Sequence, residues 1–341
     1  MSGPGITHAP ATSTGVARIE LYDRPGYVKA AEYERCVMQF TREMAKQAGV
    51  VAIYQLGGVG APGISDLDML LVFADGVPCA VDPLRHLDDV GRYVFTHGVF
   101  AVARRHFEET RALTLVHGYR LWFGTELRTR RESEPDAEPA ELRRQVAVEY
   151  LLANYLARNV EAVYGLVSVR GLLLWGHALR YDLALLGIDR GRLAELVEEL
   201  IDWRGHWFEK PVPAASIVRW FHAAVAALHA TLSELLDVQR LALPIGTPFA
   251  YARHIRLRPS HRLAVHHRGV RLPLHPDFMR RRSFRLQHRL NRFVFDVPWE
   301  VPRSGSLPAR RFDRLQSMAR ERRMLYPRFA FCGGGMSRVF P

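Results

Sequence analysis

The chain is poor in cysteine and has no long uninterrupted apolar run. Its three cysteines, at positions 36, 79 and 332, are odd in number and far apart, which excludes a disulfide framework and a zinc-ligand spacing. Such cysteine usage suits a reducing compartment, so we expect a cytoplasmic protein. The most apolar stretch, residues 160–186, is interrupted by charged residues such as Arg170 and Asp182. A bilayer span needs about 20 largely uncharged residues, so we expect a buried helix pair there and no transmembrane segment.

Several short enzyme motifs are missing as well. The sequence has no Gly-x-Ser-x-Gly elbow, no Walker phosphate-binding loop and no His-Glu-x-x-His pair. Their absence argues against the serine hydrolases, P-loop proteins and zinc proteases that carry them. The 15 histidines show no metal-ligand spacing, and we expect most of them to be ordinary surface or core histidines.

Lysine is almost absent, because the chain has 3 lysines against 44 arginines. The formal net charge is +12, and it is unevenly distributed: residues 251–341 carry +16 and the first 250 residues carry −4. A basic C-terminal third on a nearly neutral body predicts a polyanionic partner. The arginine bias has a second explanation in genome composition.

The pattern of apolar residues predicts an α+β protein with a small mixed β-sheet domain, a helical bundle and a basic, irregular C-terminal region. Within the sheet domain we expect a helix over 27–46, strands near 51–56, 69–73, 77–81, 112–117 and 119–123, and a mostly helical segment over 84–109. The polar segment 128–139 predicts a linker. The expected divisions are a tail at 1–26, the sheet domain at 27–131, the bundle at 132–243 and the basic region at 244–341.

The stretch 51–73 carries the chemistry. Its first half is apolar and partly β-branched, which predicts a buried strand that ends at Gly57 and Gly58. Glycine at these positions lets the backbone take positive φ and approach a ligand closely. A second apolar run predicts a second strand, which opens with Asp66 and Asp68.

Asp66 and Asp68 are two residues apart, so on a strand both carboxylates point to the same side. Two such acids stay ionised readily only with a cation between them or water around them. Mg²⁺ commonly binds one or two carboxylates plus substrate phosphates, and the backbone N–H groups of a glycine turn could hold those phosphates. The stretch therefore predicts a metal–triphosphate site. An alternative without chemistry stays open, in which Asp66 caps a turn and Asp68 is solvated.

The order of these residues resembles the signature of the nucleotidyltransferase superfamily, the polymerase-β-like fold. The matching positions are Gly57, Gly58, Ser65, Asp66 and Asp68, and the resemblance covers roughly residues 27–131. It implies that Gly57 and Gly58 contact a bound nucleotide, that Ser65 braces this nucleotide-binding turn, and that Asp66 and Asp68 are catalytic and hold Mg²⁺ or Mn²⁺. The implied activity is transfer of an NMP from a metal-bound NTP, such as ATP, to an acceptor.

The family carries a third carboxylate on a later strand, and this sequence shows no obvious counterpart. The best later strand, Ala112–His117, has no acid, and His117 stands about where the acid is expected. Asp82 and Glu126 are the other candidates. The family also has serine more often than glycine at the position of Gly58.

An alternative function is a binding module that keeps the fold without catalysis and contacts nucleic acid, another polyanion or a protein through the basic region. Residues 279–295 read as an amphipathic helix with arginines between apolar residues. Such a helix suits nucleic-acid phosphates or an anionic membrane surface; without a ligand, its arginine stems would cover apolar surface of the bundle. The arginines concerned are Arg280, Arg281, Arg282, Arg285, Arg289 and Arg292.

Overall fold

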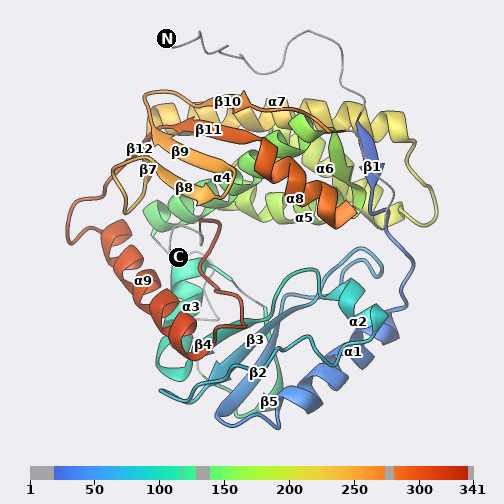
Figure 1. Ribbon diagram of the computed structural model, residues 1–341, viewed down its shortest axis with the longest axis vertical. Coiled ribbons are helices and arrows are strands. Elements are labelled where there is room, and N and C mark those ends of the chain that lie inside the picture. Colours follow the sequence, from blue (N-terminus) through green and yellow to red (C-terminus); the bar gives the residue numbers. More distant parts are fainter. Residues whose placement is uncertain (1–18, 117, 128–138, 273–279, 337–341) are drawn as a thin grey trace. The chain divides into compact units, whose positions relative to one another are not determined.

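The computed structural model describes residues 19–116, 118–127, 139–272 and 280–336 (Figure 1). It is a mixed structure of helices and small sheets that include both parallel and antiparallel pairs. The chain divides into two compact units. The sheet unit comprises Pro25–Val146 with Leu307–Pro341, and the bundle unit comprises Met1–Arg24 with Ala147–Ser306. Within the described ranges, no helix combines the length and apolarity that a membrane crossing requires.

The sheet unit is built on four strands in the order β4-β3-β2-β5. Strand β3 pairs antiparallel with β2 and parallel with β4, and β5 pairs antiparallel with the other side of β2. The elements of this unit are α1 (Ala30–Met44), β2 (Val50–Leu56), β3 (Asp68–Phe73), α2 (Asp89–Val94), β4 (Phe100–Ala103), α3 (Arg104–Thr114), β5 (Tyr119–Gly124) and α9 (Leu307–Leu325).

Helix α1 covers one face of this sheet, as its helical spacing of apolar residues predicts. Its buried side chains, which include Tyr33 and Phe40, form one core with Leu71 and Phe73 of β3. Every residue of β3 from Met69 to Phe73 is buried, which explains why this strand reads as a continuous apolar run and not as an alternating one.

The C-terminal segment returns to the sheet unit. Tyr326 stacks on Phe73 with ring centroids 4.5 Å apart, and the backbone of Ala330 pairs with β4 at Phe100. This corrects the expected division, because the region assigned to 244–341 is shared between the two units. Cys332 and Met336, near the end of this segment, are buried as well.

Three local expectations in the sheet unit are wrong. Residues 77–81 form no strand, and the segment 84–109 is not one helical region, because β4 lies inside it. Within the expected strand 112–117, residues 112–114 are the end of α3, which stops where Leu115 takes a left-handed conformation. The buried face of α3 packs inward, as in the stacking of Phe107 on Tyr54, so tertiary packing decides between helix and strand there. The linker expected at 128–139 lies almost entirely outside the described residues.

The bundle unit contains the expected run of long helices and a second four-stranded sheet, β10-β11-β9-β8. Helices α5, α6 and α7 pack in sequence order. Gly176 permits a close approach of α5 to α6, because an added Cβ would overlap the Leu200 side chain. The elements are β1 (Glu20–Tyr22), α4 (Ala140–Tyr164, which begins in the sheet unit), β6 (Leu166–Ser168), α5 (Val169–Leu185), α6 (Arg192–His206), α7 (Ala214–Val238), β7 (Leu241–Ala242), β8 (Phe249–Ala252), β9 (Ile255–Pro259), β10 (Ala264–Arg268), α8 (Arg280–Leu290), β11 (Arg292–Val297) and β12 (Trp299–Glu300).

Within the segment expected as one amphipathic helix over 279–295, the described residues form a helix and then a strand. Helix α8 ends at Leu290, and Asn291 is fully buried, its side-chain amide donating to the carbonyl oxygen of Val270 at 2.9 Å. Phe293 and Phe295 then alternate inward on β11, because pairing with β9 and β10 imposes a period of two.

Asp182 on α5 predicts a pH-dependent loss of stability. Its side chain is buried, its Oδ2 has no hydrogen-bond partner among the described residues, and burial raises its pKa to about 8. A raised carboxyl pKa favours the folded state at low pH, and this contribution is lost between about pH 4 and the folded-state value near 8. We expect Asp182→Asn to gain about 2 kcal/mol or more in unfolding free energy, relative to the natural chain, between about pH 5 and pH 8.5.

Denaturant unfolding at the two pH values measures this gain. The matched control is Asp189→Asn, at an exposed aspartate in the same unit, which should give the same difference from the natural chain at both. A pH-independent effect of Asp182→Asn would contradict the assignment.

Candidate metal centre

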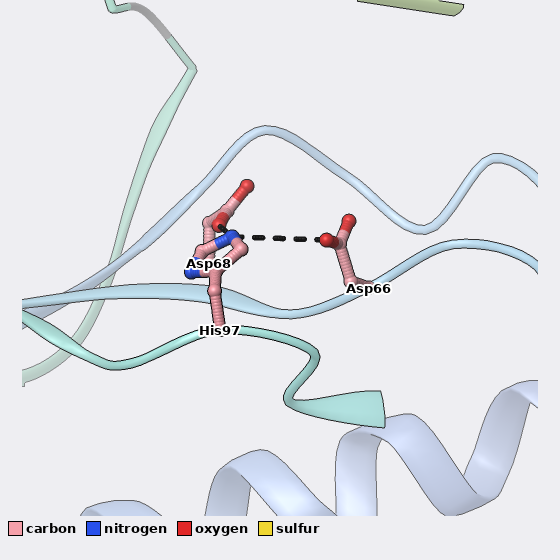
Figure 2. A group of neighbouring side chains, drawn as sticks. All are labelled: Asp66, Asp68 and His97. Atoms are coloured by element: carbon pink, nitrogen blue, oxygen red, sulfur yellow. Dashed lines mark ion pairs between the residues drawn. The ribbon is translucent and has the colours of Figure 1, made fainter. Parts of the chain in front are cut away.

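Three chain segments meet at one end of the four-stranded sheet. Strand β2 ends at Leu56, which pairs with Asp68, the first residue of β3. Because β4 runs parallel to β3, the residues that precede β4 lie at the same end as those that precede β3. Gly57, Asp66 and His97 therefore come together from three separate segments, and Figure 2 shows Asp66, Asp68 and His97 facing one another.

Around the acidic pair, successive side chains point to opposite sides, as expected of an extended chain. Leu67, between the two acids, is buried in the core and its amide donates to the Val94 carbonyl at 2.9 Å. Asp66 and Asp68 extend the other way, toward His97. Their side chains are 22% and 36% exposed, and that of His97 is 43% exposed, so a ligand from solvent can reach all three.

Ser65 shapes the loop that leads to the acids. Its side chain is buried, and its hydroxyl accepts a hydrogen bond from the Ala61 amide at 3.0 Å. The Tyr33 hydroxyl on α1 donates to the Ser65 carbonyl at 2.8 Å and accepts from the Gly63 amide at 2.9 Å. These contacts hold the loop together, and they direct the Ser65 hydroxyl to the loop backbone and not to the exposed face.

Gly57 and Gly58 are both exposed. Gly57 has a φ of 66°, in the left-handed region that favours glycine. Its amide donates to the Gly118 carbonyl at 3.0 Å, so this N–H group serves the neighbouring segment. A Cβ added at Gly58 would meet nothing within 4 Å, so no packing contact requires glycine there.

His97 supplies the third donor group. Its Nε2 lies 2.5 Å from Asp68 Oδ1 and 3.7 Å from Asp66 Oδ2. Its Nδ1 lies 3.0 Å from the Gly98 carbonyl oxygen; a carbonyl only accepts, so Nδ1 carries a proton. The Thr96 hydroxyl donates to Asp66 Oδ2 at 2.6 Å and holds that carboxylate in place.

The charges of the three groups are coupled. Burial lowers the pKa of His97, but the nearby carboxylate of Asp68 outweighs burial and raises the pKa to about 9. The imidazolium form therefore balances part of the acidic charge when no other cation is present. Behind the site, burial raises the pKa of the Cys332 thiol to about 12, so Cys332 stays neutral near Asp68.

A metal ion fits the donor atoms of this group. One ligand atom from each residue lies within 4.8 Å of the other two. Asp68 Oδ1 is buried and lies 2.5 Å from His97 Nε2, so a cation would bind this oxygen in place of the Nε2 proton. Two carboxylate oxygens and an imidazole nitrogen are common ligands of divalent metals.

The third group differs from the sequence expectation. Neither Asp82 nor Glu126 belongs to the donor cluster found among the described residues, and His117 lies outside those residues. The sequence does not single out His97, because the helical segment expected over 84–109 hides the strand that follows this residue. The short apolar run Val99–Ala103 after Gly98 could have revealed a strand there, and with it the placement of His97 at the sheet end.

The predicted arginine surface is present in part. Arg285, Arg289 and Arg292 are exposed, whereas the side chains of Arg280, Arg281 and Arg282 lie outside the described ones.

In comparisons with protein-family models, curated proteins and solved structures, no match to the chain was found.

Proposed function

We propose that this protein is a nucleotidyltransferase, which transfers an NMP from a metal-bound NTP to an acceptor. The observation that carries the proposal is the meeting, at one sheet end, of an exposed glycine turn at Gly57 and Gly58 with the carboxylates of Asp66 and Asp68. The succession of helix α1, strand β2, the glycine turn and strand β3 along the chain supports the proposal.

The residues have separate tasks in this proposal. Asp66 and Asp68 would hold Mg²⁺, and Thr96 positions Asp66 through its hydrogen bond. The exposed turn at Gly57 and Gly58 leaves room for phosphates beside the acids. A bound metal would neutralise charge on the phosphates as pyrophosphate leaves.

One observation favours a second candidate, a binding module without catalysis. The donor cluster holds two carboxylates and a histidine, and no third carboxylate among the described residues joins it. In that case the exposed Arg285, Arg289 and Arg292 would contact nucleic acid, and retention on nucleic acid would fall steeply with salt concentration.

Two labelled nucleotides test the first candidate. The natural chain is expected to bind NTP in Mg²⁺ and to lose it in EDTA. Label on the α-phosphate should pass to the acceptor, and label on the γ-phosphate should appear in pyrophosphate. NTP binding that is equal with and without metal would contradict the proposal, as would transfer of the γ-label to the acceptor.

A further inference from the structure

The donor set at the sheet end points to a particular class of metal. We infer that His97 is a metal ligand through Nε2 and that the site prefers a first-row transition-metal dication to Mg²⁺. This inference rests on the proposed metal site at Asp66 and Asp68, and it goes further in naming the third ligand and the ion that this ligand selects.

The hydrogen bond at the far side of the ring prepares His97 for this task. Nδ1 faces the Gly98 carbonyl at 3.0 Å and must donate to it. In the neutral ring the lone pair is therefore on Nε2, the nitrogen that faces Asp66 and Asp68. A backbone carbonyl that fixes the tautomer in this way is the usual arrangement behind a metal-bound histidine.

The spacing of the donor atoms suits a small dication. A metal about 2.1 Å from each ligand holds neighbouring ligands about 3 Å apart in octahedral geometry. The observed separations from Nε2 are 2.5 Å to Asp68 and 3.7 Å to Asp66, which bracket this value. Part of each side chain is exposed, so further coordination positions face solvent and can take water or phosphate oxygens.

The imidazole nitrogen discriminates among metals. Mg²⁺ prefers oxygen ligands and keeps most of its water, whereas imidazole suits Fe²⁺, Co²⁺, Ni²⁺ and Zn²⁺, and Mn²⁺ accepts carboxylates readily. A site with two carboxylates and one imidazole therefore gains more from a transition metal than from Mg²⁺. Mn²⁺ is the probe of choice, because its unpaired electrons report which atoms bind it.

The test measures binding of Mn²⁺ and Mg²⁺ alone to the full chain, without nucleotide. Pulsed electron paramagnetic resonance of bound Mn²⁺ should show modulation from a directly bound nitrogen. Growth with ¹⁵N-labelled histidine should change the frequency of this modulation, a result that needs no variant. The natural chain should bind Mn²⁺ at least about 10-fold more tightly than Mg²⁺.

Two variants isolate the ring nitrogen. His97→Gln and His97→Ala should each lose the nitrogen modulation and at least about 10-fold in Mn²⁺ affinity, with little change for Mg²⁺. The matched control is His86→Ala, at an exposed histidine of the same unit, which should leave both unchanged.

The outcomes separate this inference from the proposed function. Mn²⁺ binding without nitrogen modulation, or equal affinity for the two ions, would overturn the role of His97 and leave a carboxylate metal site intact. Absence of binding for both ions, even with NTP present, would overturn the proposed function together with the inference.

Discussion

Replacement of both carboxylates, Asp66→Asn with Asp68→Asn, is expected to abolish metal-dependent binding of NTP. The two amides keep the size of the side chains and remove both negative charges that face the donor site. Loss of a residue that only orients a metal ligand already costs about 10–100-fold in affinity. Loss of two proposed ligands should therefore weaken NTP binding in Mg²⁺ by more than about 100-fold.

Equilibrium binding of labelled NTP measures this effect. The matched control is Asp89→Asn, which removes the same charge from an exposed position on α2 and should bind NTP as the natural chain does. Because both acids are partly exposed, we expect the double variant to fold, and its thermal unfolding verifies this. A folded double variant that still binds NTP in a metal-dependent way would refute the role of the acidic pair.

Truncation of Tyr326 is expected to destabilise the sheet unit strongly. Its ring is fully buried in the core that surrounds α1 and stacks on Phe73 of β3. Removal of a buried aromatic side chain typically costs about 3–5 kcal/mol, because apolar contacts are lost and a cavity remains. Tyr326→Ala should therefore unfold the sheet unit at a clearly lower denaturant concentration.

Tyr326→Phe is the matched control. The Tyr326 hydroxyl is buried, and in the described structure it has no hydrogen-bond partner; burial also raises its pKa to about 12. Removal of this hydroxyl keeps the ring and ends the desolvation of an unpaired group, so stability should stay within about 1 kcal/mol or rise. If both substitutions had the same effect, the ring of Tyr326 would not be part of the core.

Local sequence patterns predicted the elements around the acidic pair well. Helix α1 and strands β2, β3 and β5 are all confirmed near the expected bounds. Each of these elements has a pattern of its own, helical spacing in α1 and short apolar runs in the strands, and β2 and β3 are bounded by a glycine turn and an acidic start. These apolar runs are buried whichever segment packs on them, so they predict strands without any knowledge of distant parts of the chain.

Sequence patterns are ambiguous where tertiary packing decides between helix and strand. Strand β4 is only four residues long and lies between two short helices, so its apolar run resembles part of a longer helical segment. The end of α3 contains β-prone residues, yet it completes a helix, because burial against the sheet outweighs intrinsic preference there. Strand β11 is ambiguous in the same way, because the spacing of its aromatic residues also fits one face of a helix.

By itself, the sequence determined the acidic pair, the glycine turn before it and the strands that carry them, because these features follow from residue type and from spacings within one short segment. Only the tertiary structure decided that His97 joins Asp66 and Asp68 and that Tyr326 completes the core of β3. Parallel pairing of β4 with β3 and the return of the chain after α9 create both contacts. Such contacts between distant segments leave no periodic signal in the sequence, since each depends on which surfaces meet when the sheet forms.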